Sequence, residues 1–190
     1  MTAPAPAGLA VVTGAGSPTG IGFAVARALG AAGHSLLVVS TTDRIHERVA
    51  ELHAAGFEAH GVVADLATEP GVAALADAAG GSPVDALVNN AGMAVLGEMD
   101  ALTELGAVAL ADWRRSLDLN LTTAFLVTRA FLPAMKRRGY GRIVNVSSTT
   151  GTVGAVAGDT AYAAAKAGMV GFTRALALEA APFGVTVNAV

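Results

Sequence analysis

The sequence contains no cysteine among its 190 residues. This absence excludes disulfide bonds, cysteine nucleophiles and thiolate metal sites, and it fits a reducing compartment, so we expect a cytoplasmic protein. Charged residues are scarce at 14%, and aromatic residues make up only 5%. The net charge is −3 and the one basic cluster is Lys136-Arg137-Arg138, which we expect at a helix end. The chain therefore lacks the electrostatic features of a nucleic-acid-binding protein.

Targeting, membrane and metal signals are missing as well. Met1 to Gly8 has no charged segment followed by an apolar one, so we expect no signal peptide. No uninterrupted apolar run approaches the roughly 20 residues that a spanning helix needs, which argues against a membrane partner. The histidines show no metal-ligand spacing, so we predict no metal site and expect solvated side chains at His34, His46, His53 and His60.

Small and apolar residues dominate what remains, with 53% hydrophobic residues and 23 glycines. This balance favours strands that are buried on both faces of a sheet. Short apolar runs alternate with helical repeats along the whole chain, and the runs are Leu9–Val12, Leu36–Val39, Val62-Val63, Ala86–Val88, Ile143–Val146 and Val185–Val190. The alternation predicts a single α/β domain over residues 1–190: a doubly wound, Rossmann-like parallel sheet in three layers.

Two long helices are expected in the second half of the chain. Apolar spacings of three and four predict one helix from Asp112 to Met135 and another from Ala161 to Ala181. Asp159 or Thr160 is the expected N-cap of the second helix. The stretch before Asp112, from Met93 onwards, has no clear period, and we interpret it as an irregular connection with part of a helix.

A glycine-rich turn follows the first expected strand: Gly14-Ala15-Gly16-Ser17-Pro18-Thr19-Gly20-Ile21-Gly22. Between a strand and a helix, Gly14 permits the tight turn, Gly20 lets the backbone approach a pyrophosphate, and Gly22 lets the helix pack closely. The helix N-terminus then faces the anion. A flexible surface turn is the alternative interpretation. The loop lacks the Gly-Lys-Ser/Thr ending of an NTP-binding loop, which argues against NTP hydrolysis.

Polar residues occupy the expected carboxyl ends of the strands, where this architecture binds ligands. A carboxylate at the tip of the second strand would hold a ribose diol and repel a 2′-phosphate. Ser40 and Thr41 stand there instead, with Arg44 close behind, and hydroxyls with a guanidinium suit a phosphate. Asp43 leaves a ribose contact open as the alternative. We therefore expect NADP(H) to be preferred over NAD(H).

Tyr162 and Lys166 lie one helical turn apart on the same face of the last expected helix. An ammonium at this distance stabilises a phenolate, so the tyrosine can donate or accept a proton near neutral pH. Taken alone, so short a pattern is more often an ordinary helix end with a solvated lysine. The motifs elsewhere in the chain favour the catalytic interpretation.

Taken in order, these motifs resemble those of the short-chain dehydrogenase/reductase family, from Leu9 to Val190. The resemblance rests on Thr13-Gly14 with Gly20-Ile21-Gly22, Asp65-Leu66, Asn89-Asn90-Ala91-Gly92, Asn120, Ser148 and Tyr162-x-x-x-Lys166. Within the family the chain looks most like the 3-oxoacyl-carrier-protein reductases. The resemblance implies an enzyme that transfers a hydride between NADP(H) and a small carbonyl or alcohol substrate, with a 3-oxoacyl thioester as one candidate.

The resemblance also implies a role for each motif residue. Tyr162 would be the general acid or base, and Ser148 would hydrogen-bond the carbonyl oxygen. Lys166 would bind the nicotinamide ribose, and Asn120 would hold a water that connects Lys166 to solvent. Asp65 would bind the adenine amino group and Thr41 the 2′-phosphate. The implied coenzyme contacts are Gly14, Ser17, Gly20, Ile21, Gly22, Thr41, Asp65, Leu66, Asn90, Ala91, Gly92, Tyr162 and Lys166.

The chain departs from the family pattern in three places. Five residues separate Gly14 from Gly20 where the family usually has three, and the interval from Ser148 to Tyr162 is one residue longer than in the reductases. The chain also stops at Val190, before the family's last strand and its substrate-covering segment, so we expect a truncated chain. The alternative to an active enzyme is therefore a coenzyme-binding but catalytically incompetent protein, either truncated or regulatory. For the full-length form the family implies a homodimer or homotetramer built on the two long helices.

Overall fold

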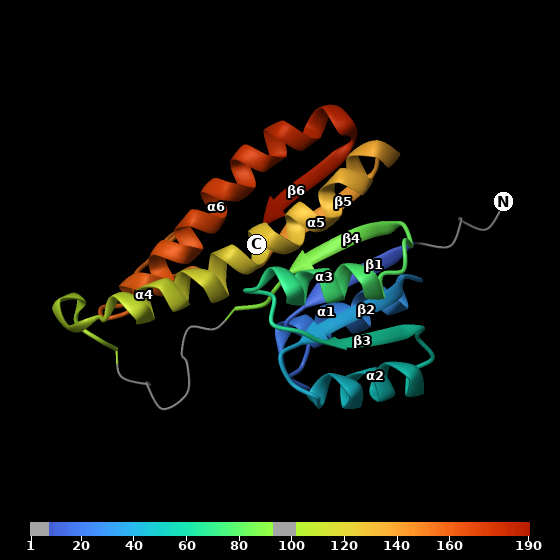
Figure 1. Cartoon of the computed structure of the whole chain (residues 1–190), viewed down its shortest axis with the longest axis horizontal. Helices are drawn as coiled ribbons and strands as arrows, with labels where there is room; N and C mark the ends of the chain where they lie inside the picture. The colour runs from blue at the N-terminus through green and yellow to red at the C-terminus, as the bar shows by residue number, and fades with distance from the viewer. Residues whose placement is uncertain (1–7, 93–101) are drawn as a thin grey trace.

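The computed structural model describes residues 8–92 and 102–190. Six strands form one sheet in the order β3-β2-β1-β4-β5-β6, and every neighbouring pair is parallel. Helices lie on both faces of this sheet, so the predicted doubly wound, three-layer α/β fold is confirmed (Figure 1). The strands are β1 (Leu9–Thr13), β2 (Ser35–Ser40), β3 (Ala59–Val63), β4 (Val84–Asn89), β5 (Gly141–Asn145) and β6 (Val185–Ala189).

Two hydrophobic cores, one on each side of the sheet, explain why the strands are continuous apolar runs. In β1, Val11 belongs to the core formed with α3 (Glu69–Ala78), α5 (Thr123–Arg138) and α6 (Thr160–Ala180). Its neighbour Val12 belongs to the core formed with α1 (Ile21–Ala31) and α2 (Arg44–Ala54). Alternate side chains thus point to opposite faces, and both faces are buried. Among the described residues, no helix combines the length and the apolar character needed to cross a membrane.

The helix expected from Asp112 to Met135 is present, but it is not uniform. It consists of α4 (Leu110–Leu117), a five-residue π-helical turn, η2 (Asp118–Thr122), and α5. The apolar repeat gives no sign of this wider turn, so the prediction of one regular helix is corrected here. A short 3₁₀ turn, η1 (Leu105–Ala107), precedes α4, and the earlier part of the unpatterned stretch, residues 93–101, lies outside the described residues.

The other long helix, α6, spans the predicted range almost to the residue, and a 3₁₀ turn, η3 (Ala181–Phe183), follows it. Asp159 occupies the N-cap position, but its side chain accepts no capping hydrogen bond from the helix. The expectation of a side-chain cap there is therefore wrong. Lys136-Arg137-Arg138 form the last turn of α5, as expected for cations at the negative end of a helix dipole. Figure 1 shows α4 and the start of α6 beyond the carboxyl ends of the strands.

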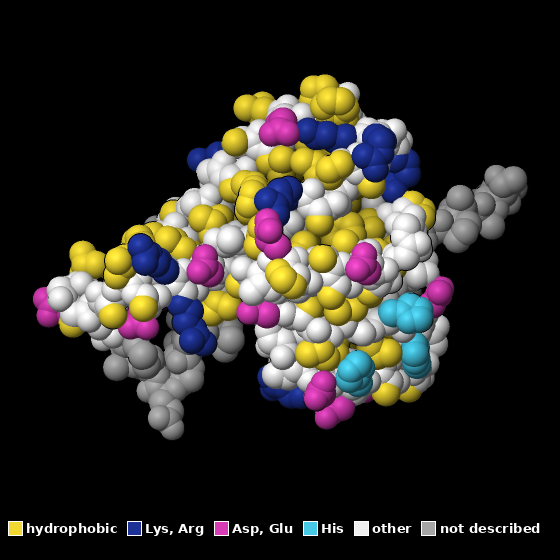
Figure 2. Space-filling view, in the orientation of Figure 1, with side chains coloured by type: hydrophobic (Ala, Val, Ile, Leu, Met, Phe, Trp, Pro, Cys, Tyr) yellow, Lys and Arg dark blue, Asp and Glu magenta, His cyan; other side chains and the backbone are white. Residues whose placement is uncertain are grey.

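Two of the histidines are held by backbone carbonyls, so the expectation that they are simply solvated is corrected. His34 Nδ1 lies 2.8 Å from the carbonyl oxygen of Gly8, and His53 Nε2 lies 2.8 Å from that of Ala59. In Figure 2 the visible histidine side chains lie at the lower right, away from the end to which the strands point. Within residues 8–92 and 102–190, no group of three or more histidine and acidic side chains could hold a metal ion.

Candidate active site

The predicted catalytic residues come from three segments that meet at the carboxyl edge of the sheet. Lys166, on the first turns of α6, is 3% exposed, and its Nζ donates a hydrogen bond of 2.9 Å to the carbonyl oxygen of Val146, just after β5. The same Nζ lies 5.6 Å from the centre of the Tyr162 ring. Burial of the ammonium lowers the pKa of Lys166 below its ordinary value.

Asn120, at the centre of the π-helical turn, is fully buried and faces the same lysine. Its Nδ2 donates to the carbonyl oxygen of Ser116 at 3.0 Å, which fixes the orientation of the amide. A methyl group placed on Gly92 would lie 2.6 Å from Asn120 Oδ1 and 3.3 Å from Lys166 Nζ. The amide oxygen and the ammonium therefore both lie close to Gly92, and a side chain at this position would displace the Asn120 amide.

Ser148 follows β5 and precedes the loop that leads to α6. Its Oγ accepts the backbone N–H of Thr150 at 3.1 Å, which leaves the hydroxyl proton available for another acceptor. The neighbouring Ser147 instead donates to the carbonyl oxygen of Lys166 at 3.0 Å. The two serines thus have different environments. Ser147 links the end of β5 to α6, whereas the Ser148 hydroxyl donates to no acceptor within the described ranges. This supports Ser148 as the donor to the carbonyl oxygen.

The loop between Ser148 and Tyr162 is held against α6 by one glycine. Gly151 has a φ of +87°, and a side chain at this position would collide with the carbonyl group of Ala163 in the first turn of α6. Close approach of the two backbones therefore requires glycine. This contact brings the segment after Ser148 onto the helix turn that carries Tyr162, even though the interval is longer than the resemblance leads one to expect.

The glycine-rich loop runs from β1 to α1 as predicted. Gly14 has a φ of +69°, and an added Cβ would lie 2.9 Å from both Ala91 Cα and Asn90 Nδ2. Asn90 Nδ2 donates to the carbonyl oxygens of Thr13 and Gly14 at 3.0 and 3.1 Å, which joins the ends of β1 and β4. The two extra residues form an exposed turn that closes with a 3.2 Å hydrogen bond from Gly20 N–H to the Ser17 carbonyl, and α1 still begins at Ile21.

The start of α1 fits the pyrophosphate of a dinucleotide. No side chain caps this helix, and its first turn contains no acidic residue. Its first N–H groups therefore lack a side-chain acceptor and carry the positive end of the helix dipole. A phosphate at this position would accept hydrogen bonds from them. Ile21 is exposed at this N-terminus, whereas Leu66, after β3, is buried in the core and can contribute only its backbone to a ligand.

The tip of β2 differs from the prediction in one respect. The Ser40 hydroxyl is engaged locally, because it donates to the Thr42 carbonyl at 2.8 Å and accepts the Thr42 N–H at 3.2 Å. Arg44 Nε donates to Thr42 Oγ1 at 3.2 Å, while its terminal NH₂ groups have no partner within the described ranges. Thr41 is exposed. The donors left for a phosphate are therefore Thr41 and Arg44 rather than Ser40.

Asp65 lies after β3 on the same edge of the sheet. One carboxylate oxygen, Oδ1, accepts the backbone N–H of Ala67 at 3.0 Å, and the side chain remains exposed. The next helix, α3, is capped by Thr68, whose hydroxyl accepts the Gly71 N–H at 3.2 Å. Asp65 thus keeps its second oxygen for a ligand.

Three contacts that shape this site were not predicted from the sequence. The Val146 carbonyl has no sequence signal, because any residue supplies a carbonyl group. Ser147 gives no sequence signal of its contact, a hydrogen bond to the Lys166 carbonyl that positions α6. Thr13 Oγ1 accepts the backbone N–H groups of Asn90 and Ala91 at 2.9 and 2.8 Å and so shapes the end of β4. A threonine at the end of an apolar run was the available signal for the last of these.

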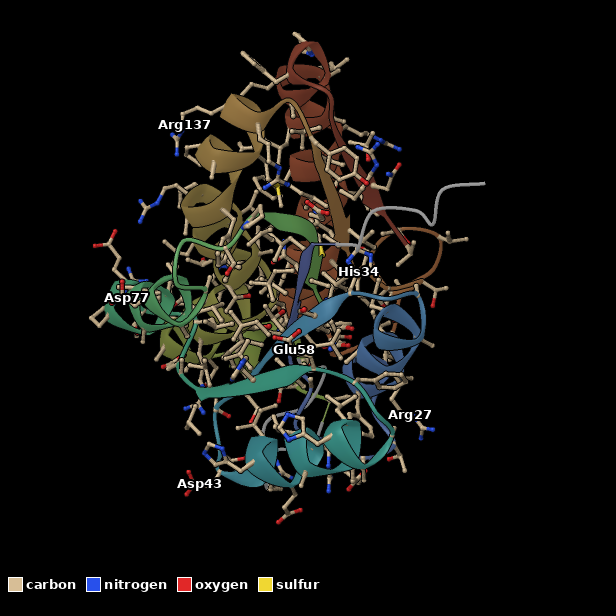
Figure 3. All side chains as sticks on the ribbon, turned by 90° about the vertical axis from the view of Figure 1, so that its right-hand side faces the viewer. Arg27, His34, Asp43, Glu58, Asp77 and Arg137 are labelled. Carbon is tan, nitrogen blue, oxygen red and sulfur yellow. The ribbon has the colours of Figure 1, made fainter. Side chains whose placement is uncertain are left out.

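A separate cavity of about 380 Å³ lies at the opposite edge of the sheet, at the amino ends of β1, β2 and β3. Gly8, Glu58 and His60 are among the residues that line it, and Ser35 Oγ donates to Glu58 Oε2 at 2.8 Å. Figure 3 looks onto this end of the molecule and shows Glu58 and His34 there. The cavity contains none of the predicted site residues, which all belong to the carboxyl edge.

Known proteins resemble the chain along nearly its whole length. A family model described as short chain dehydrogenase matches residues 8–190. A 3-oxoacyl-[acyl-carrier-protein] reductase of Aquifex aeolicus is 40% identical over 184 residues, which cover 92% of this chain and 69% of the relative. Crystal structures show the same fold in a variant actinorhodin polyketide ketoreductase with NADPH and in a metagenomic short-chain oxidoreductase with NADP.

The ketoreductase is 41% identical with a TM-score of 0.86, and the alignment covers 95% of this chain and 68% of that one. The metagenomic oxidoreductase is 36% identical with a TM-score of 0.85, over 95% of this chain and 80% of that one. The family match spans the glycine loop, the strand ends and the helix with Tyr162 and Lys166. On these grounds the chain belongs to the short-chain dehydrogenase family of oxidoreductases.

Proposed function

We propose that the chain is an NADP(H)-dependent reductase of carbonyl compounds, that Tyr162 is its general acid, and that 3-oxoacyl thioesters are its substrate class. The observation that carries the proposal is the convergence on Lys166: its buried Nζ lies beside the Tyr162 ring, the Val146 carbonyl and the Asn120 amide. An ammonium held in this position interacts favourably with the negative charge that develops on the phenolic oxygen as the proton leaves it. The coenzyme, when bound, supplies the hydride that adds to the carbonyl carbon.

The residues of the chain then handle the oxygen of the substrate. Ser148 donates its free hydroxyl proton in a hydrogen bond to this oxygen, and such a donor stabilises the negative charge that develops there. Tyr162 donates its phenolic proton to the same oxygen to complete the alcohol. A water held by Asn120, which lies close to Lys166, returns a proton to the site. In the reverse direction, Tyr162 acts as the base.

Coenzyme binding follows from the loop and the strand ends. The uncapped start of α1 binds the pyrophosphate, and Thr41 with the terminal NH₂ groups of Arg44 binds the 2′-phosphate. Asp65 accepts a hydrogen bond from the adenine amino group. Two relatives of known structure hold NADPH or NADP, which supports the same coenzyme here. All four predicted catalytic side chains are present at one edge, and this does not favour a catalytically incompetent protein.

The substrate class rests on the relatives named as 3-oxoacyl and ketoacyl reductases, at 40–43% identity. The test is oxidation of NADPH, followed by its absorbance, with 3-oxoacyl thioesters, simple ketones and keto-sugars at equal concentration. The proposal predicts the highest kcat/KM for the thioesters and, in Tyr162→Phe, turnover lowered by about 10²- to 10⁴-fold for every substrate. A preference for keto-sugars would overturn the substrate class alone. Near-normal turnover in Tyr162→Phe would overturn the mechanism.

Assembly is part of the same proposal: a second copy packs on the outer faces of α5 and α6. Phe125 on α5 is 43% exposed and Leu178 on α6 is 80% exposed, so both helices present apolar side chains outward. Light scattering at micromolar concentration should give the mass of a dimer or tetramer, and Leu178→Asp should lower it. A monomer in the unsubstituted protein would contradict the proposal.

A further inference from the structure

Four buried polar side chains form a connected network behind the catalytic edge, one each on β4, β5, α5 and α6. Asn89 Nδ2 donates to Thr128 Oγ1 at 2.9 Å and to Asn145 Oδ1 at 2.8 Å. Asn145 Nδ2 donates to Thr173 Oγ1 at 2.8 Å, and this hydroxyl donates to the carbonyl oxygen of Met169 at 2.8 Å. None of the four side chains is more than 5% exposed. The function proposed above uses none of them.

The network lies directly beneath Lys166. Asn145 is the last residue of β5, and the next carbonyl along the chain, that of Val146, accepts the hydrogen bond from Lys166 Nζ. Thr173 follows Lys166 by two turns of α6, so both side chains lie on the helix face that packs against β5. The helix is therefore joined to this strand by side chains at two levels: Thr173 to Asn145 below, and Lys166 with Ser147 above.

Stability alone is a poor explanation for this arrangement. Asn89 Oδ1 is buried and has no hydrogen-bond partner among the residues that the structure describes. An unsatisfied buried acceptor destabilises the folded state, and apolar side chains of similar shape would avoid that cost. What the amides provide, and apolar side chains cannot, is directional bonds that fix the position of α6 along β5.

We propose that Asn145 and Thr173 are positioning residues that hold the Lys166 ammonium beneath the Val146 carbonyl and against Tyr162. The effect on turnover rests on the proposed function. The effect on the position of Lys166 does not, because it follows from the hydrogen bonds of the network. Loss of the Thr173 hydroxyl leaves Asn145 Nδ2 without an acceptor, and α6 can then shift relative to the strand. Misplacement of reacting groups by about 1 Å can lower a rate on the order of 100-fold.

The chain offers a matched control. Thr128 is also a buried threonine that accepts one bond from the same network, but it lies on α5, which carries neither Tyr162 nor Lys166. Thr173→Val and Thr128→Val each replace one hydroxyl by a methyl group of nearly equal size. We expect both variants to lose similar thermal stability, whereas only Thr173→Val lowers kcat/KM, on the order of 10- to 100-fold, and shifts the pH–rate profile. Thr173→Ser keeps the hydroxyl, so its kcat/KM and its pH–rate profile should match those of the unsubstituted protein.

A second readout needs neither coenzyme nor substrate. The sequence contains two lysines, Lys136 and Lys166, so carbon NMR of the lysine ε-carbons gives two resolvable titrations, and Lys136→Arg assigns them. Among residues 8–92 and 102–190, the titratable side chain beside the Lys166 ammonium is Tyr162. The segments after β4 and β5, together with η2, contribute uncharged groups there: Gly92, the Val146 carbonyl and Asn120. Burial lowers the pKa of Lys166, so loosening of α6 should raise its titration midpoint in Thr173→Val and not in Thr128→Val.

The outcomes separate the two proposals. Equal titration midpoints and equal kcat/KM in Thr173→Val and Thr128→Val would overturn the positioning role, since the network would then act only through stability. Full activity of Tyr162→Phe would defeat the proposed function but leave the NMR titration as a valid test of the inference. If Thr173→Val does not fold, Thr173→Ala removes the same hydroxyl without the risk of a steric clash, and the same comparison decides.

Discussion

Lys166 Nζ and the carbonyl oxygen of Val146 lie 2.9 Å apart, at a side chain that is 3% exposed. A single carbonyl dipole replaces only part of the hydration that an ammonium has in water, so burial lowers the pKa of Lys166. The lysine that we propose for proton transfer is thus destabilising in its charged form. This conflict between stability and function can be measured.

The stability of the folded chain should depend on pH through Lys166. Because the folded pKa of Lys166 lies below its ordinary value of 10.5, the unfolded chain binds more protons in the window between the two values. Stability must therefore rise as the pH increases through this window. Urea unfolding should show that the free energy of unfolding of the unsubstituted protein rises relative to Lys166→Met between neutral pH and about pH 10.5. A difference that stays constant with pH would contradict the desolvation argument.

Substitution of the catalytic pair should separate chemistry from coenzyme binding. Tyr162→Phe removes one hydroxyl, so we expect turnover to fall by about 10²- to 10⁴-fold with nearly unchanged affinity for NADPH. Lys166→Ala should reduce both turnover and affinity, because the ribose contact that we propose for Lys166 is lost as well. Steady-state kinetics and calorimetric titration measure the two effects. Near-normal kcat in Tyr162→Phe would show that another group supplies the proton.

Coenzyme choice should depend on the residues just after β2. Thr41→Ala combined with Arg44→Ala removes the donors proposed for the 2′-phosphate, and NADPH binding should weaken by about 1–3 kcal/mol. NADH has no such phosphate, so its dissociation constant should change little and acts as the internal control. Equal affinity for the two coenzymes in the unsubstituted protein would mean that Asp43 or another group binds the ribose hydroxyls and that the 2′-phosphate is not recognised.

Two glycines of the loop before α6 should respond very differently to alanine. Gly151 has a φ of +87° and no room for a side chain beside Ala163, whereas Gly154 has open space around its Cβ position. Gly151→Ala should cost about 1–3 kcal/mol in backbone strain, with further loss from the clash, and should displace Ser148 from Tyr162. We expect lower thermal stability and lower kcat/KM for Gly151→Ala, and near-normal values for Gly154→Ala. Equal thermal stability and equal kcat/KM of the two variants would mean that the loop can accommodate a side chain at position 151.

Much of the fold could be predicted because hydrophobic periodicity reports burial directly. Each apolar run became a strand, since both faces of a parallel sheet are covered, and α6 begins and ends within one residue of its prediction. The turn at Gly14 was predictable for a related reason: its backbone conformation and close contacts require glycine. In these cases the residue type itself is dictated by local geometry.

Other features depend on contacts that a sequence does not display. The Val146 carbonyl is a backbone group, and the network of Asn89, Asn145 and Thr173 joins residues 28 and 56 positions apart. Asn145 interrupts an apolar run, and a polar residue inside a buried strand indicates that its side chain has a hydrogen-bond partner in the core. Ser40 was assigned to a phosphate on residue type, yet its hydroxyl is consumed by its own turn. Local side-chain to backbone bonds of this kind compete with ligand binding.

The π-helical turn at Asp118–Thr122 sets the rotational phase between the two halves of one continuous helix. A π turn contains one residue more than an α-helical turn allows, so everything after it is rotated by about 100°, the angle of one residue. This lets α4 pack on α6 while α5 packs on β4 and α3. Deletion of one residue there would return the segment to regular α-helix. The packing face of α4 or that of α5 would then point away from the elements it contacts. The length of this segment is therefore fixed by geometry, and insertions or deletions in it should be tolerated far less than substitutions.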